Sequence, residues 1–276
     1  MPFVITADNT RIHYEVTGRP GATPVLMIQG LGASKNGWNL QRAAMATRFR
    51  IIALDNRGAG RSDKPTAAFT LEQMADDAIA VLDAAGIEDA HIVGASMGGV
   101  ISQIIAVKYP ERVRSLSLVC TACRNHPWRH ELLQSWATTA QNDGLLALGK
   151  HTAPWVMSPR SFRRLLPAMG WMGPLSVLRP RQSFVAQVNA ILDTDEAMVD
   201  ALSTITAPTL IVVGNQDVLT PRGDSEELAE RIAHAELVVI SGAAHGLMFE
   251  HASTFNGILI DFLHRSEAAR ALSASR

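Results

Sequence analysis

The chain has few cysteines, few aromatic residues and almost no net charge. Its 276 residues include two cysteines and 5% aromatic residues, and 25 Lys and Arg offset 26 Asp and Glu, for a net charge of −1. Two cysteines cannot build a disulfide framework. A near-zero net charge gives no uniform electrostatic reason to bind nucleic acid or an anionic membrane. With 47% hydrophobic residues, the chain can instead bury a large core.

Secretory and membrane-spanning signals are also weak. Residues 1–15 lack the basic and then apolar plan of a secretory signal, which predicts a cytoplasmic protein. The stretch 90–107 carries no Asp, Glu, Lys or Arg and approaches the length of a membrane span. Its glycines and the polar residues Ser96, Ser102 and Gln103 favour a buried strand, a tight turn and a buried helix instead. We therefore expect no membrane partner.

Short apolar runs alternate with helical patterns along most of the chain. The runs predict strands at 11–16, 25–29, 50–54, 91–94, 113–119, 208–214 and 236–241. The clearest helical pattern, at 71–86, begins after Thr70 as a possible N-cap and stops at Gly86. Further helices are expected near 223–234 and 248–264. This alternation predicts an α/β fold with a mostly parallel sheet covered by helices on both faces.

Residues 122–192 interrupt the alternation and differ in composition. They hold four of the five tryptophans and eight Lys or Arg against two Asp or Glu, so they carry +6 and the remainder −7. Prolines divide the segment into short pieces. We expect a helical cap at 122–192, inserted into a core domain made of 1–121 and 193–276. The charge contrast has two interpretations: steering of an anionic substrate, or ordinary charge complementarity between elements, which is the simpler one.

The motif Gly-Ala-Ser-Met-Gly-Gly at 94–99 directly follows a predicted strand and precedes a helical stretch. A serine on so sharp a turn is held in strained backbone geometry with its hydroxyl exposed, and small neighbours let adjacent elements pass close by. The pattern predicts that Ser96 is a nucleophile. An ordinary strand-to-helix connection is the alternative.

Two later residues complete a possible catalytic set with Ser96. Asp217 and His245 each follow a predicted strand, and the carboxyl ends of parallel strands meet at one edge of a sheet. Glu250 and His251 lie close to His245 in sequence, but they fall inside the expected closing helix, where a charged pair usually forms a solvated face. We therefore predict Ser96, Asp217 and His245 as a catalytic triad.

Acyl transfer also needs donors for the oxyanion that forms during the reaction. The Met97 N–H lies at a helix start, where unpaired donors and the helix dipole favour an anion. The loop Gln29-Gly30-Leu31-Gly32 turns sharply, and the Leu31 N–H is the second candidate donor. As the alternative, these glycines simply form a tight turn.

Two weaker signals concern metals and the substrate pocket. Cys120 and Cys123 have C-x-x-C spacing, but no second pair or nearby histidine set completes a zinc site, so we expect no metal. Side chains of the cap could line an apolar acyl pocket, or they could only pack its helices together. The predicted pocket residues are Gln29, Trp128, Trp155 and Trp171.

With this inventory the chain resembles the α/β-hydrolase superfamily over essentially its whole length. Residues 55–62, DNRGAGRS, are similar to the family's Asp-x-Arg-Gly-x-Gly-x-Ser turn. One departure is Gln29, where relatives commonly have histidine before the glycine. The motif at 94–99 with a helical cap is similar to bacterial carboxylesterases, enol-lactonases and cofactor-free haloperoxidases or perhydrolases. Residues 30–38 and 245–256 resemble hydrolases that cleave carbon–carbon bonds in ring-fission products.

The resemblance implies a serine hydrolase that cleaves a carboxylic ester or a lactone without a cofactor. Carbon–carbon bond hydrolysis and perhydrolase or haloperoxidase activity remain open alternatives, because all of these enzymes share one triad. A hydrolase-shaped receptor for a small molecule is the alternative outside enzymes. The expected partner is a small-molecule ester or lactone; a homo-oligomer is compatible with the sequence.

Overall fold

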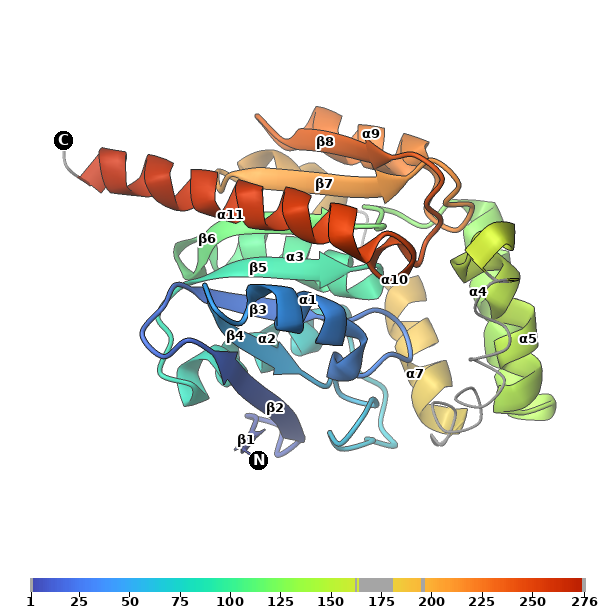
Figure 1. The fold of residues 1–276 in the computed structure, drawn as a ribbon. Helices are drawn as coiled ribbons and strands as arrows, with labels where there is room; N and C mark the ends of the chain where they lie inside the picture. The colour runs from blue at the N-terminus through green and yellow to red at the C-terminus, as the bar shows by residue number, and fades with distance from the viewer. Residues whose placement is uncertain (1, 162, 164–180, 195–196, 275–276) are drawn as a thin grey trace.

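The computed structural model describes residues 2–161, 163, 181–194 and 197–274. Within them, eight strands form one sheet in the order β1-β2-β4-β3-β5-β6-β7-β8 (Figure 1). The strands are β1 (Phe3–Ile5), β2 (Arg11–Gly18), β3 (Pro24–Ile28), β4 (Arg50–Leu54), β5 (Ala90–Ala95), β6 (Val113–Val119), β7 (Thr209–Gly214) and β8 (Glu236–Ile240). Strand β2 is antiparallel to β1 and β4, and the strands from β4 to β8 are parallel to one another. The predicted sheet is confirmed; β1 is an addition.

Helices cover both faces of this sheet (Figure 1). One face packs against α2 (Leu71–Ala84), α3 (Met97–Lys108) and α9 (Arg222–Arg231), and the other against α1 (Asn39–Met45) and α11 (Ala252–Ala274). Strands β5 and β7 are buried at every position, as strands covered on both faces must be. The apolar runs of the sequence therefore correspond to the interior layer of the fold.

Capping residues set the start and end of α2 as the sequence predicts. The Thr70 hydroxyl accepts the N–H of Gln73, and the Gln73 side chain accepts the N–H of Thr70. This reciprocal pair satisfies two donors that the first turn leaves unpaired. Gly86, with φ of 65°, follows the end of the helix in the left-handed region that glycine adopts without strain.

Between β6 and β7 the chain leaves the sheet and forms α4 (Pro127–Asn142), α5 (Leu145–Val156) and α7 (Arg181–Leu192), which we call the insertion helices. They lie beyond the arrowheads of the strands, at the carboxyl edge of the sheet (Figure 1). This is where the predicted cap falls. The short helix α8 (Ala197–Ala201) leads back toward β7.

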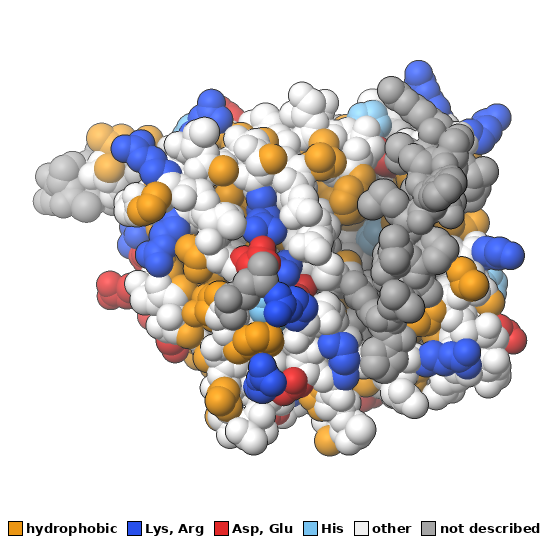
Figure 2. Space-filling view, turned by 60° about the horizontal axis from the view of Figure 1, so that its bottom comes forward, with side chains coloured by type: hydrophobic (Ala, Val, Ile, Leu, Met, Phe, Trp, Pro, Cys, Tyr) orange, Lys and Arg blue, Asp and Glu red, His pale blue; other side chains and the backbone are white. Residues whose placement is uncertain are grey.

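Ion pairs join the start of the insertion to the core. Arg124 lies 2.6 Å from Glu227, and Arg129 on α4 pairs with Asp224, both carboxylates being on α9. On the face drawn in Figure 2, outside the grey residues, Lys and Arg side chains are likewise spread among acidic and apolar ones. These two pairs favour charge complementarity as the simpler interpretation of the charge contrast.

The closing helix predicted at 248–264 forms as two helices, α10 (Leu247–Glu250) and α11. The break falls at His251, whose φ of −126° and ψ of 39° leave the helical region. The apolar stretch at 90–107 forms β5, the turn at Ser96 and most of α3, as expected. Among the helices that the structure describes, none has the length and apolar character of a membrane span.

Candidate active site

Ser96 lies on a strained turn between β5 and α3. Its φ of 53° and ψ of −122° are rare for a residue with a side chain. Nearby backbone leaves room only for glycine: a Cβ on Gly94 would lie 2.1 Å from the Gly98 oxygen, and one on Gly98 would lie 2.3 Å from the Ile28 oxygen. The motif at 94–99 thus has the expected context: strand β5 before it, a tight turn at Ser96 and helix α3 after it.

The loop after β3 passes directly beside Ser96. A Cβ on Gly30 would lie 3.0 Å from the Ser96 Cβ. Leu31, in this loop, and Met97 both line the same cavity as Ser96. The main-chain N–H groups of Leu31 and Met97 have no hydrogen-bond partner among the described residues. Two unpaired donors are therefore present near the hydroxyl, as acyl transfer requires.

Gln29, which departs from the histidine expected from the family resemblance, stabilises this loop from inside. Its Oε1 accepts the N–H of Gly30 at 3.2 Å, and its main-chain oxygen accepts the Asn56 side-chain amide at 2.8 Å. Gln29 also lines the cavity, as predicted. Because these bonds leave the Leu31 N–H unused, the departure from histidine does not remove the candidate donor.

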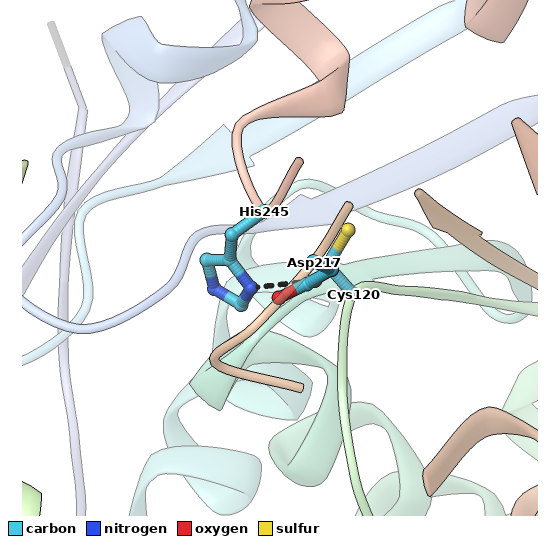
Figure 3. A group of neighbouring side chains, drawn as sticks. All are labelled: Cys120, Asp217 and His245. Carbon is cyan, nitrogen blue, oxygen red and sulfur yellow. Dashed lines mark hydrogen bonds and ion pairs between the residues drawn. The ribbon is translucent and has the colours of Figure 1, made fainter. Parts of the chain in front are cut away.

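Asp217 and His245 form a hydrogen-bonded pair on neighbouring loops, after β7 and β8 (Figure 3). Nδ1 of His245 lies 2.9 Å from Oδ2 of Asp217. The N–H groups of Leu219 and Thr220 donate to Oδ1, each at 2.9 Å, and the Thr220 hydroxyl donates to Oδ2 at 2.8 Å. The carboxylate is thus held from several directions.

The charge of Asp217 sets the proton position on His245. Burial by itself raises the pKa of Asp217, but the His245 ring and the Thr220 hydrogen bonds outweigh it and hold that pKa below its usual value. An ionised carboxylate only accepts hydrogen bonds, so Nδ1 of His245 is the donor in this pair. In the neutral ring this places the lone pair on Nε2, the atom that a general base uses.

The three predicted residues gather at one edge of the sheet. Ser96 and His245 line one cavity, and Asp217 stands behind His245 with 5% of its surface exposed. The Ser96 hydroxyl forms no hydrogen bond with any described residue. In enzymes without bound substrate, such catalytic bonds are often long and tighten only in the complex.

The cavity has a volume of about 870 Å³, and its wall is mostly apolar. Loops at the carboxyl edge of the sheet and the insertion helices both contribute to that wall. Trp136 lines the cavity, but Trp128 and Trp155 do not belong to the described lining. These two rings stack on each other with centroids 6.2 Å apart, and Trp128 is 39% exposed. Trp171 lies outside the described residues. The pocket assignment thus moves to Trp136, because a hydrophobic pattern does not reveal which side of a helix meets the cavity.

Cys120 lies beside Asp217 and His245, at the end of β6 (Figure 3). Potential metal-ligating atoms of these three residues lie within 4.8 Å of one another. Burial, followed by the nearby Asp217 charge, raises the pKa of the Cys120 thiol well above 9, whereas a metal binds the thiolate. Both Asp217 oxygens already accept hydrogen bonds. The trio is therefore better suited to hydrogen bonding than to holding an ion.

Glu250 corrects one sequence interpretation. It does not belong to a solvated helix face: its carboxylate accepts the N–H of Ala244 at 2.9 Å and the N–H of Ser158 at 2.7 Å.

Thr220, which donates to Asp217, is a second residue that the sequence analysis does not identify. Its place three residues after an aspartate is a local turn signal, because aspartate side chains bond the backbone a few residues ahead. Nothing local to Glu250 indicates its contacts.

Comparison with known proteins agrees with this fold. Residues 23–252 match the family model described as alpha/beta hydrolase fold. A protein of Caulobacter vibrioides named as a carbamate hydrolase, RutD, is 32% identical over 261 residues, which cover 91% of this chain and 95% of that protein.

Two solved structures are similar over nearly their full length. The enol-lactonase from Burkholderia xenovorans LB400 has a TM-score of 0.88 at 27% identity, covering 95% of this chain and 100% of that one. A meta-cleavage product hydrolase from Pseudomonas fluorescens IP01, CumD, has a TM-score of 0.80 at 25% identity, covering 96% and 98%.

Proposed function

Because the chain belongs to the alpha/beta hydrolase fold family, we propose that it is a serine hydrolase that cleaves a carboxylic ester or a lactone. One observation carries this proposal. Ser96, on its strained turn, shares a cavity with His245, whose Nδ1 is held by Asp217. The same cavity holds two main-chain N–H groups that no described residue pairs. A nucleophile, a base and oxyanion donors are the parts that acyl transfer needs.

In the first step, Nε2 of His245 takes the Ser96 proton while Oγ attacks the substrate carbonyl carbon. Negative charge collects on the carbonyl oxygen, which the N–H groups of Met97 and Leu31 bind. His245 then gives its proton to the leaving oxygen as the carbon–oxygen bond breaks. The acyl group remains on Ser96; in a lactone, the leaving alcohol stays attached to it.

In the second step, His245 takes a proton from water, and the hydroxide attacks the acyl-enzyme carbonyl. The same donors bind the oxyanion, and His245 returns its proton to Ser96 as the acid leaves. Asp217 stays ionised throughout and stabilises the imidazolium. Losing one oxyanion donor typically costs about 2.7 to 4 kcal/mol in the barrier.

The cavity supports a neutral substrate with a sizeable apolar group. Its volume of about 870 Å³ is near the upper end of small-molecule sites. The Lys and Arg side chains in its described wall are Arg124, Arg129 and Lys150. Arg124 and Arg129 already pair with carboxylates of α9, and Lys150 is exposed to solvent. In this proposal residues 122–192 act as a cap whose helices contribute to the apolar wall, and their positive charge serves packing.

Two other reactions have specific support. The carbamate hydrolase name of a 32% identical relative favours a carbamate carbonyl as the target. The similarity to a meta-cleavage product hydrolase favours carbon–carbon bond hydrolysis. Both reactions would use the same residues, so the choice rests on a substrate panel of p-nitrophenyl esters, lactones, carbamates and vinylogous diketones.

The decisive experiment combines fluorophosphonate labelling with turnover of p-nitrophenyl butyrate. We expect the wild type to be labelled and active, and Ser96→Ala to lose both properties while keeping its thermal unfolding profile. Ser203→Ala is the matched control, because Ser203 is an exposed serine whose hydroxyl bonds only the Asp200 oxygen. Undiminished turnover by Ser96→Ala would overturn the proposal, and a folded wild type without turnover on any panel member would favour a receptor.

A further inference from the structure

We propose that Glu250 is a positioning residue that fastens the His245 loop to the cavity wall formed by the insertion. This inference rests on the function proposed above, because it concerns the base of that reaction. It assigns no contact with substrate to Glu250; the residue acts through His245.

A single carboxylate joins two segments that are far apart in the sequence. Oε2 of Glu250 accepts the N–H of Ala244, the residue before His245, at 2.9 Å. Oε1 accepts the N–H of Ser158, just beyond the end of α5, at 2.7 Å. Two N–H donors that face one side chain need two acceptor atoms, and an ionised carboxylate supplies both.

A backbone bond fastens the other side of His245 to the same segment. The N–H of Gly246 donates to the Val156 oxygen at 2.7 Å. Both neighbours of His245 are thus tied to residues 156–158. Val156 and Met157 also line the cavity, so the stretch of insertion that a substrate touches is the one that holds the base.

Glu250 is the last residue of the four-residue helix α10, five positions after His245. Its side chain therefore reaches back to the loop that carries His245. Because a displacement of about 1 Å at a catalytic group can reduce the rate about a hundredfold, the precise hold on His245 matters for turnover.

The test replaces one oxygen of this carboxylate. Glu250→Gln has the same shape, but its amide NH₂ faces an N–H donor, so one of the two bridges is lost. We expect kcat for p-nitrophenyl butyrate, per active site titrated with a fluorophosphonate, to fall at least tenfold while KM changes less than twofold. Glu250→Asp keeps both acceptors on a shorter arm and is expected to recover part of the lost kcat.

Glu226→Gln is the matched control. It makes the same change at a carboxylate on α9 that pairs with Arg222 on the same helix, so kcat is expected to stay within twofold of wild type. A purely structural role for Glu250 would change the number of titrated sites and the melting temperature, and leave kcat per site unchanged.

The outcomes separate this inference from the proposed function. Wild-type kcat per site in Glu250→Gln overturns the inference and leaves Ser96 chemistry intact. A wild type with neither label nor turnover overturns the proposed function itself. Should Glu250→Gln fail to fold, Glu250→Asp decides: at least a threefold loss of kcat at unchanged KM supports the inference, and unchanged kcat overturns it.

Discussion

Nδ1 of His245 lies 2.9 Å from Oδ2 of Asp217, and three further hydrogen bonds from Leu219 and Thr220 hold that carboxylate. The pair lies under the cavity wall with little exposed surface. In the proposed reaction this fixed carboxylate would orient the imidazole before substrate binds, so that no reorganisation is needed when positive charge develops on the ring.

Asp217→Asn is expected to keep the fold and to lose about 10³- to 10⁴-fold in kcat. The amide is isosteric, but its NH₂ group cannot accept the Nδ1–H of His245, so the imidazole takes the wrong tautomer. Measuring kcat on p-nitrophenyl butyrate per titrated site checks this. Thr220→Val removes one of the four bonds to Asp217 and is expected to cost much less. Equal activities of Asp217→Asn and wild type would remove Asp217 from the mechanism.

The same substitution has a consequence for stability against pH. The pKa of Asp217 is lower in the folded protein than its usual 3.8, so its ionised form stabilises the fold above that pH. This contribution is lost as the pH falls through and below 3.8. Thermal unfolding of wild type and Asp217→Asn should therefore differ most near neutral pH and converge in acid. A difference in melting temperature that grows as the pH falls would contradict the lowered pKa of Asp217.

Acyl-chain length should control turnover. Each CH₂ group that enters the apolar cavity contributes about 0.8 kcal/mol, which corresponds to as much as a fourfold gain in kcat/KM per carbon. We expect kcat/KM to rise from p-nitrophenyl acetate to the octanoate. The matching ester with a terminal carboxylate should be the poorer substrate, because Arg124 and Arg129 already have carboxylate partners. A preference for the charged ester would show that a cation of the cavity wall, Arg124, Arg129 or Lys150, binds the substrate carboxylate.

Much of the fold is readable from the sequence because its strands are buried on both faces. Apolar runs such as 208–214, PTLIVVG, correspond to strands within one or two residues. Strand β1 is different: it has three residues, and its pairing with β2 depends on contacts across the sheet edge. The break at His251 is also non-local, since the side chain of the preceding Glu250 bonds Ala244 and Ser158.

The candidate site also has a part that the sequence predicts and a part that it does not. Ser96, Asp217 and His245 follow from chain order and from the shared edge of parallel strands. The tryptophans expected in the pocket do not, because the insertion helices are apolar on more than one side: Trp136 lines the cavity, whereas Trp128 and Trp155 stack on each other. Which side of a helix meets a cavity depends on its packing partners, and those become known only in three dimensions.

Two glycine substitutions should have opposite effects on stability. In Gly98→Ala the new Cβ would meet the Ile28 oxygen at 2.3 Å and the Gln29 oxygen at 2.8 Å. Because these are backbone atoms, we expect a loss of about 1 to 3 kcal/mol and lower activity from the displaced loop. Gly257→Ala on α11 meets no atom within 4 Å and should stabilise by about 0.4 to 1 kcal/mol. Urea unfolding of both variants checks the contrast; similar free energies would contradict it.

Iodoacetamide at pH 8 should leave the enzyme active. Burial raises the pKa of Cys123 to about 11 and that of Cys120 well above 9. A raised thiol pKa lowers the thiolate fraction at a given pH, by about a hundredfold for a rise of two units. Cys120 lines the cavity beside Asp217, so an adduct there would block turnover, and retained activity reports a buried, protonated thiol.

Two controls accompany this experiment. Unfolding in urea should expose both cysteines to alkylation, which is detected by mass. A fluorophosphonate should inactivate the folded enzyme. Rapid inactivation with an adduct on Cys120 would instead show a thiolate next to Asp217 and make that cysteine a rival to Ser96 as the nucleophile.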